Sequence, residues 1–195
     1  MPGSRPPKIR PKPVAEWDAS IAALAGDPNS PGGGTLNVFG TLANHPQLLK
    51  RWLVFGNHVL FKNSLSDRAR ELVILRTGWN CSSPYEWGQH IVIGRAVGIT
   101  DDEVRAIADG PNAPSWADPE RALLQAADEL HTHSCIADAT WSLLVEHLDD
   151  EQLLDLVFTV GQYHLVAMAL NSCRVERDDG VDAASLPFPV HPDEQ

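Results

Sequence analysis

Apolar residues recur along most of the chain at intervals of three and four positions, the period of an α-helix with one buried face. Apolar and polar residues nowhere alternate cleanly over five or more positions, as they would in a half-buried strand. The sequence therefore predicts an all-α fold, a bundle of about eight helices with short connections. The helical stretches are 14–26, 35–45 (a short helix or a turn), 46–61, 65–80, 84–98, 103–110, 118–133, 137–148 and 149–173.

Several of these stretches carry recognisable start and stop signals. Ser66 or Asp67 is suited to cap the helix that follows it, and Thr100 with Glu103 has the spacing of a capping box. Pro119 follows Asp118, a typical first helical turn. Gly26 is placed to close the first helix.

Proline-rich segments frame the helical region at both ends of the chain. Neither segment can continue a helix or a central strand, so both are expected to be extended arms, lying on a neighbouring copy or free. The expected organisation is an N-terminal arm (1–14), one helical domain (15–178) and a C-terminal arm (179–195).

Composition limits the kinds of binding partner and indicates the redox state of the compartment. The net charge of -11 argues against binding to a nucleic-acid backbone. Three cysteines without paired spacing favour a reducing, cytoplasmic environment over a disulfide framework. The most apolar run, 153–170, contains Asp155, Gln162 and His164, which indicates a buried helix rather than a membrane span.

The stretch "CSSPYEWGQH", residues 81–90, holds the main candidate chemistry. Glu86 and His90 are four residues apart, so one helical turn brings them together. A carboxylate on one ring nitrogen would fix the tautomer of His90 and leave the other nitrogen free to act as a general acid or base. Glu71 lies beside the apolar run 72–75, where it needs a partner: Arg68, Arg70 or Arg76 in a salt bridge, or a catalytic site.

Other residues are candidates to contact a substrate. Cys81 precedes a helix start, where a thiol is either activated or simply buried. Tyr85 is adjacent to the Glu86–His90 pair and could donate a hydrogen bond. His58 lies on an apolar helix and could face the same pocket, as could Tyr163 and His164.

The segment "HTHSC" has a spacing that suggests metal ligands. His131, His133 and Cys135 lack a second cluster to complete a site, so no metal is expected there. Glu71, Glu86 and His90 as metal ligands remain an alternative.

The pattern "REL.ILR....C.SPYEWGQH..IGRAVGIT.DEV.AI", with "ALLQAADELH" and "LLDLVF.VGQYH.VAMALNS" further on, resembles the carboxymuconolactone decarboxylase family, part of the alkylhydroperoxidase D-like superfamily. The resemblance covers about residues 35–178. Peroxidases of that superfamily use a C-x-x-C motif. With Glu71 and His90 aligned, its two positions hold Ser83 and Glu86, so peroxide reduction by a thiol pair is not expected.

The resemblance implies the decarboxylase-like branch, with Glu71, Glu86 and His90 as the catalytic set. It implies a lyase that needs no metal or organic cofactor, acts on a small carboxylated or lactone-like substrate, and assembles as a homo-oligomer (dimer, trimer or hexamer). A redox enzyme using Cys81 alone, another proton-transfer reaction such as isomerisation or dehydration, and a non-enzymatic assembly module remain open.

Overall fold

The computed structural model describes residues 6–25, 36–178 and 185–194, and this part of the chain is helical, with no β-strand. The all-α prediction is confirmed. The α-helices are α1 (Ala19–Ala25), α2 (Asn37–Leu42), α3 (Pro46–Phe61), α4 (Asp67–Asn80), α5 (Pro84–Ala96), α6 (Asp101–Asp109), α7 (Asp118–His133), α8 (Asp138–Leu144) and α9 (Asp150–Cys173). Short 3₁₀ turns cover Val14–Glu16 and Pro192–Glu194.

Helix α4 is the centre of the molecule and packs against α5, α7 and α9. The side chains of its apolar run, 72–75, pack into three different hydrophobic clusters. Leu72 and Leu75 join a core with α5 and α6, Val73 joins one with α7 to α9, and Ile74 contacts Val59 and Tyr163. Because each face of α4 meets a different neighbour, the run 72–75 is apolar on every face of the helix.

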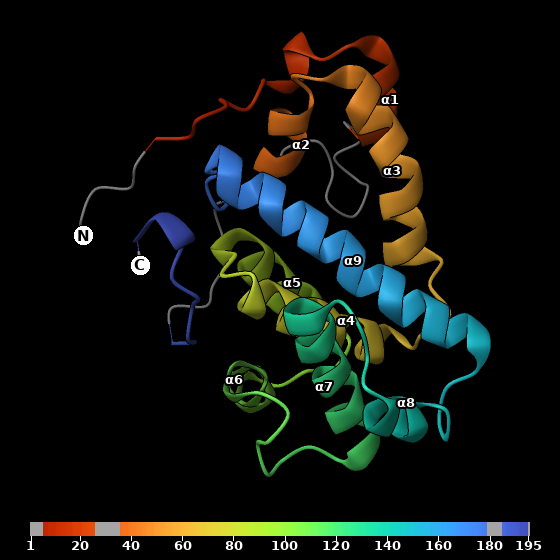
Figure 1. Cartoon of the computed structure of the whole chain (residues 1–195). Coiled ribbons are helices and arrows are strands. Elements are labelled where there is room, and N and C mark those ends of the chain that lie inside the picture. Colours follow the sequence, from red (N-terminus) through yellow and green to blue (C-terminus); the bar gives the residue numbers. More distant parts are fainter. Residues whose placement is uncertain (1–5, 26–35, 179–184, 195) are drawn as a thin grey trace.

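Helix α9 runs diagonally between the group of α1 to α3 and the group of α6 to α8 (Figure 1). By length and composition alone it is the one helix in the described part that could cross a membrane. Half of its apolar window is buried inside the protein, however, as in a core helix of a folded domain.

The helix boundaries follow the sequence signals closely. The side chain of Ser66 caps α4, Thr100 and Glu103 form the capping box of α6, and Pro119 lies in the first turn of α7. Gly26 lies outside the described residues.

One predicted helix, 14–26, is wrong as a continuous element. The chain is extended at Trp17 between the 3₁₀ turn and α1. The Asp18 carboxylate accepts hydrogen bonds from the amide and the hydroxyl of Ser20, so it starts a new helix instead of continuing the first.

The described parts of both arms pack on the same chain. The Lys8 amide donates to the Cys173 carbonyl oxygen over 2.8 Å, and the Lys12 amide donates to Gly40 over 2.9 Å. At the other end, the Trp87 indole donates to the Pro187 carbonyl oxygen over 2.8 Å, and Leu186 is buried in the core.

Candidate active site

Two consecutive helices position the residues that the sequence singles out. α4 ends at Asn80, a short turn follows, and Pro84 begins α5, so the two helices form a tightly packed hairpin. This hairpin brings Glu71, in the middle of α4, against His90, in the middle of α5. Neither helix could form this contact alone, because 19 residues separate the two side chains.

His90 lies between two carboxylates. Its Nδ1 is 2.6 Å from Glu71 Oε2, and its Nε2 is 3.2 Å from Glu86 Oε1. The exposed fractions are 0% for Glu71 and 5% for both Glu86 and His90. The three residues therefore form one buried, hydrogen-bonded unit.

The two carboxylates determine the charge of the imidazole. Burial alone would lower the pKa of His90, but Glu71 and Glu86 outweigh it and raise this pKa from 6.5 to about 9. At neutral pH the ring is thus an imidazolium, and each N–H donates to one carboxylate.

This arrangement corrects one sequence interpretation. The i,i+4 pair was expected to leave one ring nitrogen of His90 free. The structure places Glu71 on the nitrogen that the helical neighbour Glu86 does not contact, because the hairpin supplies a second acid.

Glu71 also has a cationic partner. Arg70 Nε donates to Glu71 Oε1 over 3.1 Å, and its Nη1 donates to Asp67 over 2.7 Å. Arg68 instead binds Glu103 and Glu120, and Arg76 binds Asp128. The salt bridge and the contact with His90 occur together, one at each oxygen of the carboxylate.

A pocket of about 400 Å³ opens beside this unit, between α2, α3, α5 and α9. Its walls are mainly apolar, and a volume of this size suits a small organic ligand. The polar lining groups include Arg70, Glu86, Gln89, His90 and Gln162; the apolar ones include Leu53, Leu60, Phe61, Val92, Ile93 and Val166. Glu71 lies behind His90 and does not line the pocket.

Two lining residues were missed from the sequence. Trp52 Nε1 and Gln162 Oε1 are buried, and within the described part of the chain neither has a hydrogen-bond partner. Because an unpaired buried polar atom is costly, these two are natural contacts for a bound molecule. Each lies alone on an apolar helix, so only the tertiary arrangement identifies it.

Tyr85 lines the pocket, as expected of a substrate contact. Its hydroxyl, however, accepts from the Val38 amide over 3.3 Å and donates to Asp178 over 2.5 Å. Burial, assisted by Asp178, raises the pKa of Tyr85 above its ordinary value. This phenol therefore shapes the wall as a neutral group.

His58 and Cys81, also expected to contact substrate, lie outside the pocket lining. The α3 residues that line it include Gly56, Asn57, Leu60 and Phe61, whereas His58 is exposed and has its Nε2 3.7 Å from Asp155. Cys81 is directed towards α7 and α9.

The Tyr163–His164 pair is divided between two environments. The Tyr163 ring packs edge-on against His90, with centroids 4.9 Å apart, and burial raises the pKa of this phenol. His164, on the next position of α9, contacts His131 instead, and His133 does not line the pocket either.

Metal binding by Glu71, Glu86 and His90 does not fit this geometry. The two carboxylates contact opposite nitrogens of one ring, so they cannot converge with that ring on one ion. Within the described residues, the group of His, Cys, Asp and Glu close enough to hold a metal is Cys81, His131 and His164.

The fold recurs in solved structures of low sequence identity. An uncharacterized peroxidase-related protein from Ralstonia eutropha, with an alkylhydroperoxidase AhpD core, is 20% identical, with a TM-score of 0.80 over 91% of this chain and 95% of its own. The debrominase Bmp8, as an alanine variant in complex with 2,3,4-tribromopyrrole, is 10% identical, with a TM-score of 0.73 over 93% and 97%. A protein of unknown function from Agrobacterium tumefaciens is 19% identical, with a TM-score of 0.66 over 70% and 94%.

These neighbours show that the chain shares their helical fold. Residues 46–129, which contain the α4–α5 hairpin, match the model of the Carboxymuconolactone decarboxylase family. The matched segment, less than half of the chain, is similar to that family, and the described fold as a whole is similar to that of the AhpD-like structures. No curated protein sequence matches the chain.

Proposed function

We propose that this protein is an acid/base enzyme of the carboxymuconolactone decarboxylase type, a lyase that removes CO₂ from a small carboxylated or lactone-like substrate without a cofactor. The observation that carries the proposal is His90 held between two carboxylates at the wall of an apolar pocket. Such a group can store one proton at neutral pH and return it to a reacting carbon.

The proposed reaction has two steps. Cleavage of the bond to the carboxylate releases CO₂ and leaves an electron pair delocalised onto the carbonyl of the lactone, as a dienolate. The Glu86–His90 pair then delivers a proton to carbon, and water returns a proton to the pair. Glu71, which does not line the pocket, keeps the imidazole oriented and charged.

Polar groups around the pocket support binding of such a substrate. The Arg70 guanidinium suits a carboxylate, which guanidinium groups bind well. Trp52 Nε1 can donate to a carbonyl oxygen, and the Gln162 amide can bind a hydroxyl or a carbonyl. The debrominase with a related fold binds a small flat ring, tribromopyrrole, which is the size of ligand we propose here.

The test is turnover of a series of carboxylated unsaturated lactones in D₂O, with CO₂ release and deuterium incorporation measured together. We expect CO₂ release with one deuterium at a carbon of the dienolate, either the carbon that lost the carboxylate or the carbon next to the lactone carbonyl. His90→Gln and Glu86→Gln should each lower kcat by about 100-fold or more, the usual effect of losing a general acid. His58→Gln, on the outer face of α3, is the matched control and should leave kcat unchanged.

Full turnover by His90→Gln would refute the assigned role of His90. Deuterium exchange without CO₂ release would replace decarboxylation by an isomerisation or dehydration that uses the same pair. Inactivity of the wild-type enzyme on the whole series would contradict the proposed substrate class.

Redox chemistry at Cys81 has weaker support. Burial, and to a lesser extent Glu86, raises the pKa of this thiol to about 12, so little thiolate is present at neutral pH. Ser83 and Glu86, at the aligned C-x-x-C positions, cannot form a disulfide. Peroxide treatment followed by mass spectrometry should therefore leave Cys81 unoxidised.

A further inference from the structure

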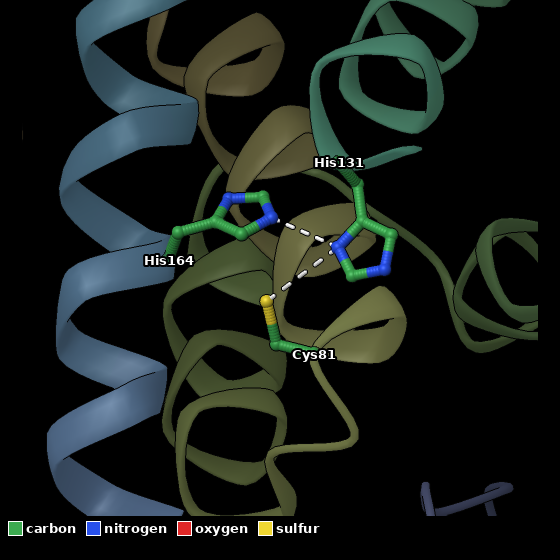
Figure 2. Close-up of side chains that lie close together, drawn as sticks. All are labelled: Cys81, His131 and His164. Atoms are coloured by element: carbon green, nitrogen blue, oxygen red, sulfur yellow. Dashed lines mark hydrogen bonds between the residues drawn. The ribbon is translucent and has the colours of Figure 1, made fainter. Parts of the chain in front are cut away.

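Three side chains that the proposed reaction does not use converge on one point between three helices. Cys81 caps the end of α4, His131 lies near the end of α7, and His164 lies in the middle of α9 (Figure 2). Their ligand atoms all lie within 4.8 Å of one another. His131 Nδ1 is 2.8 Å from His164 Nε2 and 3.9 Å from Cys81 Sγ.

A backbone contact orients His164 for this meeting. Its Nδ1 lies 2.8 Å from the Val160 carbonyl oxygen, one helical turn earlier, and only an N–H can bond to that acceptor. In the neutral ring the proton is therefore on Nδ1, and Nε2 presents a lone pair to His131 and Cys81. A ring nitrogen anchored on a carbonyl is the usual second contact of a histidine that ligates a metal.

We propose that Cys81, His131 and His164 bind one divalent metal ion of the Zn²⁺ class. One sulfur and two imidazole nitrogens are a ligand set that zinc favours, and three protein ligands leave a fourth position open. The site is separate from the pocket of the proposed lyase, since none of the three residues lines it.

The spacing of the three atoms is close to that of a tetrahedral site. With metal–nitrogen bonds of about 2.0 Å and a metal–sulfur bond of about 2.3 Å, the nitrogens lie about 3.3 Å apart and the sulfur about 3.5 Å from each nitrogen. The imidazoles would thus separate by about half an ångström from the observed 2.8 Å, and the thiol would approach His131 by a few tenths from 3.9 Å. The third separation, between Cys81 and His164, is at most 4.8 Å and would also shorten to about 3.5 Å.

The solvent exposure of the cluster and the charges around it are compatible with metal binding. His131 is exposed, whereas Cys81 and His164 are partly buried, so the open position faces solvent. Arg76 and Asp128, which both act electrostatically on His131, are paired with each other over 2.6 Å, so they largely cancel. On binding, the metal replaces the thiol proton, which leaves to solvent, and His131 gives up its contact with His164.

The experiment uses tag-free, full-length protein, reduced and handled under nitrogen, with Co²⁺ as a spectroscopic substitute for Zn²⁺. We expect one Co²⁺ per chain, with a thiolate-to-cobalt absorption band and the strong visible bands of a tetrahedral ion. Zn²⁺ should displace the Co²⁺. Cys81→Ser should lose the thiolate band, and His131→Ala and His164→Ala should each weaken Zn²⁺ binding by at least about tenfold, since each removes a ligand.

The matched controls are His133→Ala and Cys135→Ser, two and four residues after His131 in sequence but outside the cluster. Both should bind like the wild type. Circular dichroism checks that each variant is folded. A second measurement needs no variant: Zn²⁺ should slow the alkylation of Cys81 in the wild type and leave that of Cys135 unchanged, as read by peptide mass spectrometry.

Two results would overturn the proposal. One is a wild-type Co²⁺ complex without a thiolate band; the other is alkylation of Cys81 at the same rate with and without Zn²⁺. The outcome is independent of the proposed lyase activity, because His90→Gln should still bind Zn²⁺ like the wild type.

Discussion

At the scale of single residues, two carboxylate contacts determine the charge of the His90 imidazole. A buried histidine is ordinarily neutral, because burial disfavours the charged ring. Here one carboxylate at each nitrogen reverses that preference and raises the pKa to about 9. In the proposed function the ring is the general acid, and in the folded protein it is a charge that Glu71 and Glu86 stabilise.

The stability of the fold should therefore depend on pH through His90. The pKa is 6.5 ordinarily and about 9 in the folded protein, so the contribution is complete below about pH 6.5 and is lost as the pH rises through 9. We expect the free energy of unfolding of the wild type, relative to His90→Gln, to fall by about 3 kcal/mol between pH 6 and pH 10, at about 1.4 kcal/mol per pKa unit. Urea unfolding at several pH values measures this.

Glu71→Gln provides an independent check of the cause. Removing this charge should move the imidazole pKa back towards 6.5, which NMR titration of the ring detects. A ring that titrates near pH 6.5 in the wild type would contradict the assignment.

At the scale of elements, one helix is capped by the side chain of another. The N-cap residue of α8, Ala137, has no side-chain acceptor. Glu129 of α7 takes this role: its Oε2 accepts from the Ala137 amide and its Oε1 from the Thr140 hydroxyl, each over 2.8 Å. Burial would raise the pKa of Glu129, but these hydrogen bonds outweigh it and lower the pKa.

We expect Glu129→Gln to lower the free energy of unfolding by about 1–2 kcal/mol, the usual loss for a helix cap or a hydrogen bond to a charged group. Because the folded-state pKa is depressed, the wild-type contribution is present above the ordinary value of 4.5 and is lost as the pH falls through the folded pKa. Denaturant unfolding at pH 7 and pH 3 measures both effects. Glu146→Gln, an exposed control just after α8, should change neither, and an equal loss there would argue against the capping role.

At the scale of the whole molecule, an apolar stripe lies on the surface of α9. Leu154, Phe158, Leu165 and Met168 are each more than half exposed. With Gly161, they repeat at intervals of four and three, the seam spacing of packed helices. A Cβ at Gly161 would meet nothing within 4 Å, so the stripe has a shallow notch there. Exposed apolar surface of this kind marks an interaction site.

We propose that the homo-oligomer expected from the family resemblance uses this stripe. Phe158→Asp should then reduce the mass measured by size-exclusion chromatography with light scattering to that of a smaller assembly, because it buries a charge in the contact. Leu143→Asp, at an exposed apolar position on α8, is the control and should leave the mass unchanged. An unaltered mass in Phe158→Asp would exclude the stripe as the interface.

The positions of the helices are determined by local sequence signals. The caps at Ser66 and Thr100 and the proline at position 119 act within one turn, so their positions are readable without the fold. The pairing of Glu86 with His90 is equally local, since one helical turn joins them. The all-α fold class and the Glu86–His90 pair of the candidate site can therefore be predicted from the sequence alone.

The contacts between helices could be identified only from the tertiary structure. Glu71 and His90 lie on consecutive helices, and Cys81, His131 and His164 are separated by several elements. In both cases no local pattern fixes which helix face meets which. The sequence suggested His58 for the pocket because it lies on an apolar helix. It suggested Cys81, and grouped His131 with His133 and Cys135, because these residues are close in sequence. Packing of α4 against α5, α7 and α9 decided instead which side chains share a cavity and which share a candidate metal site.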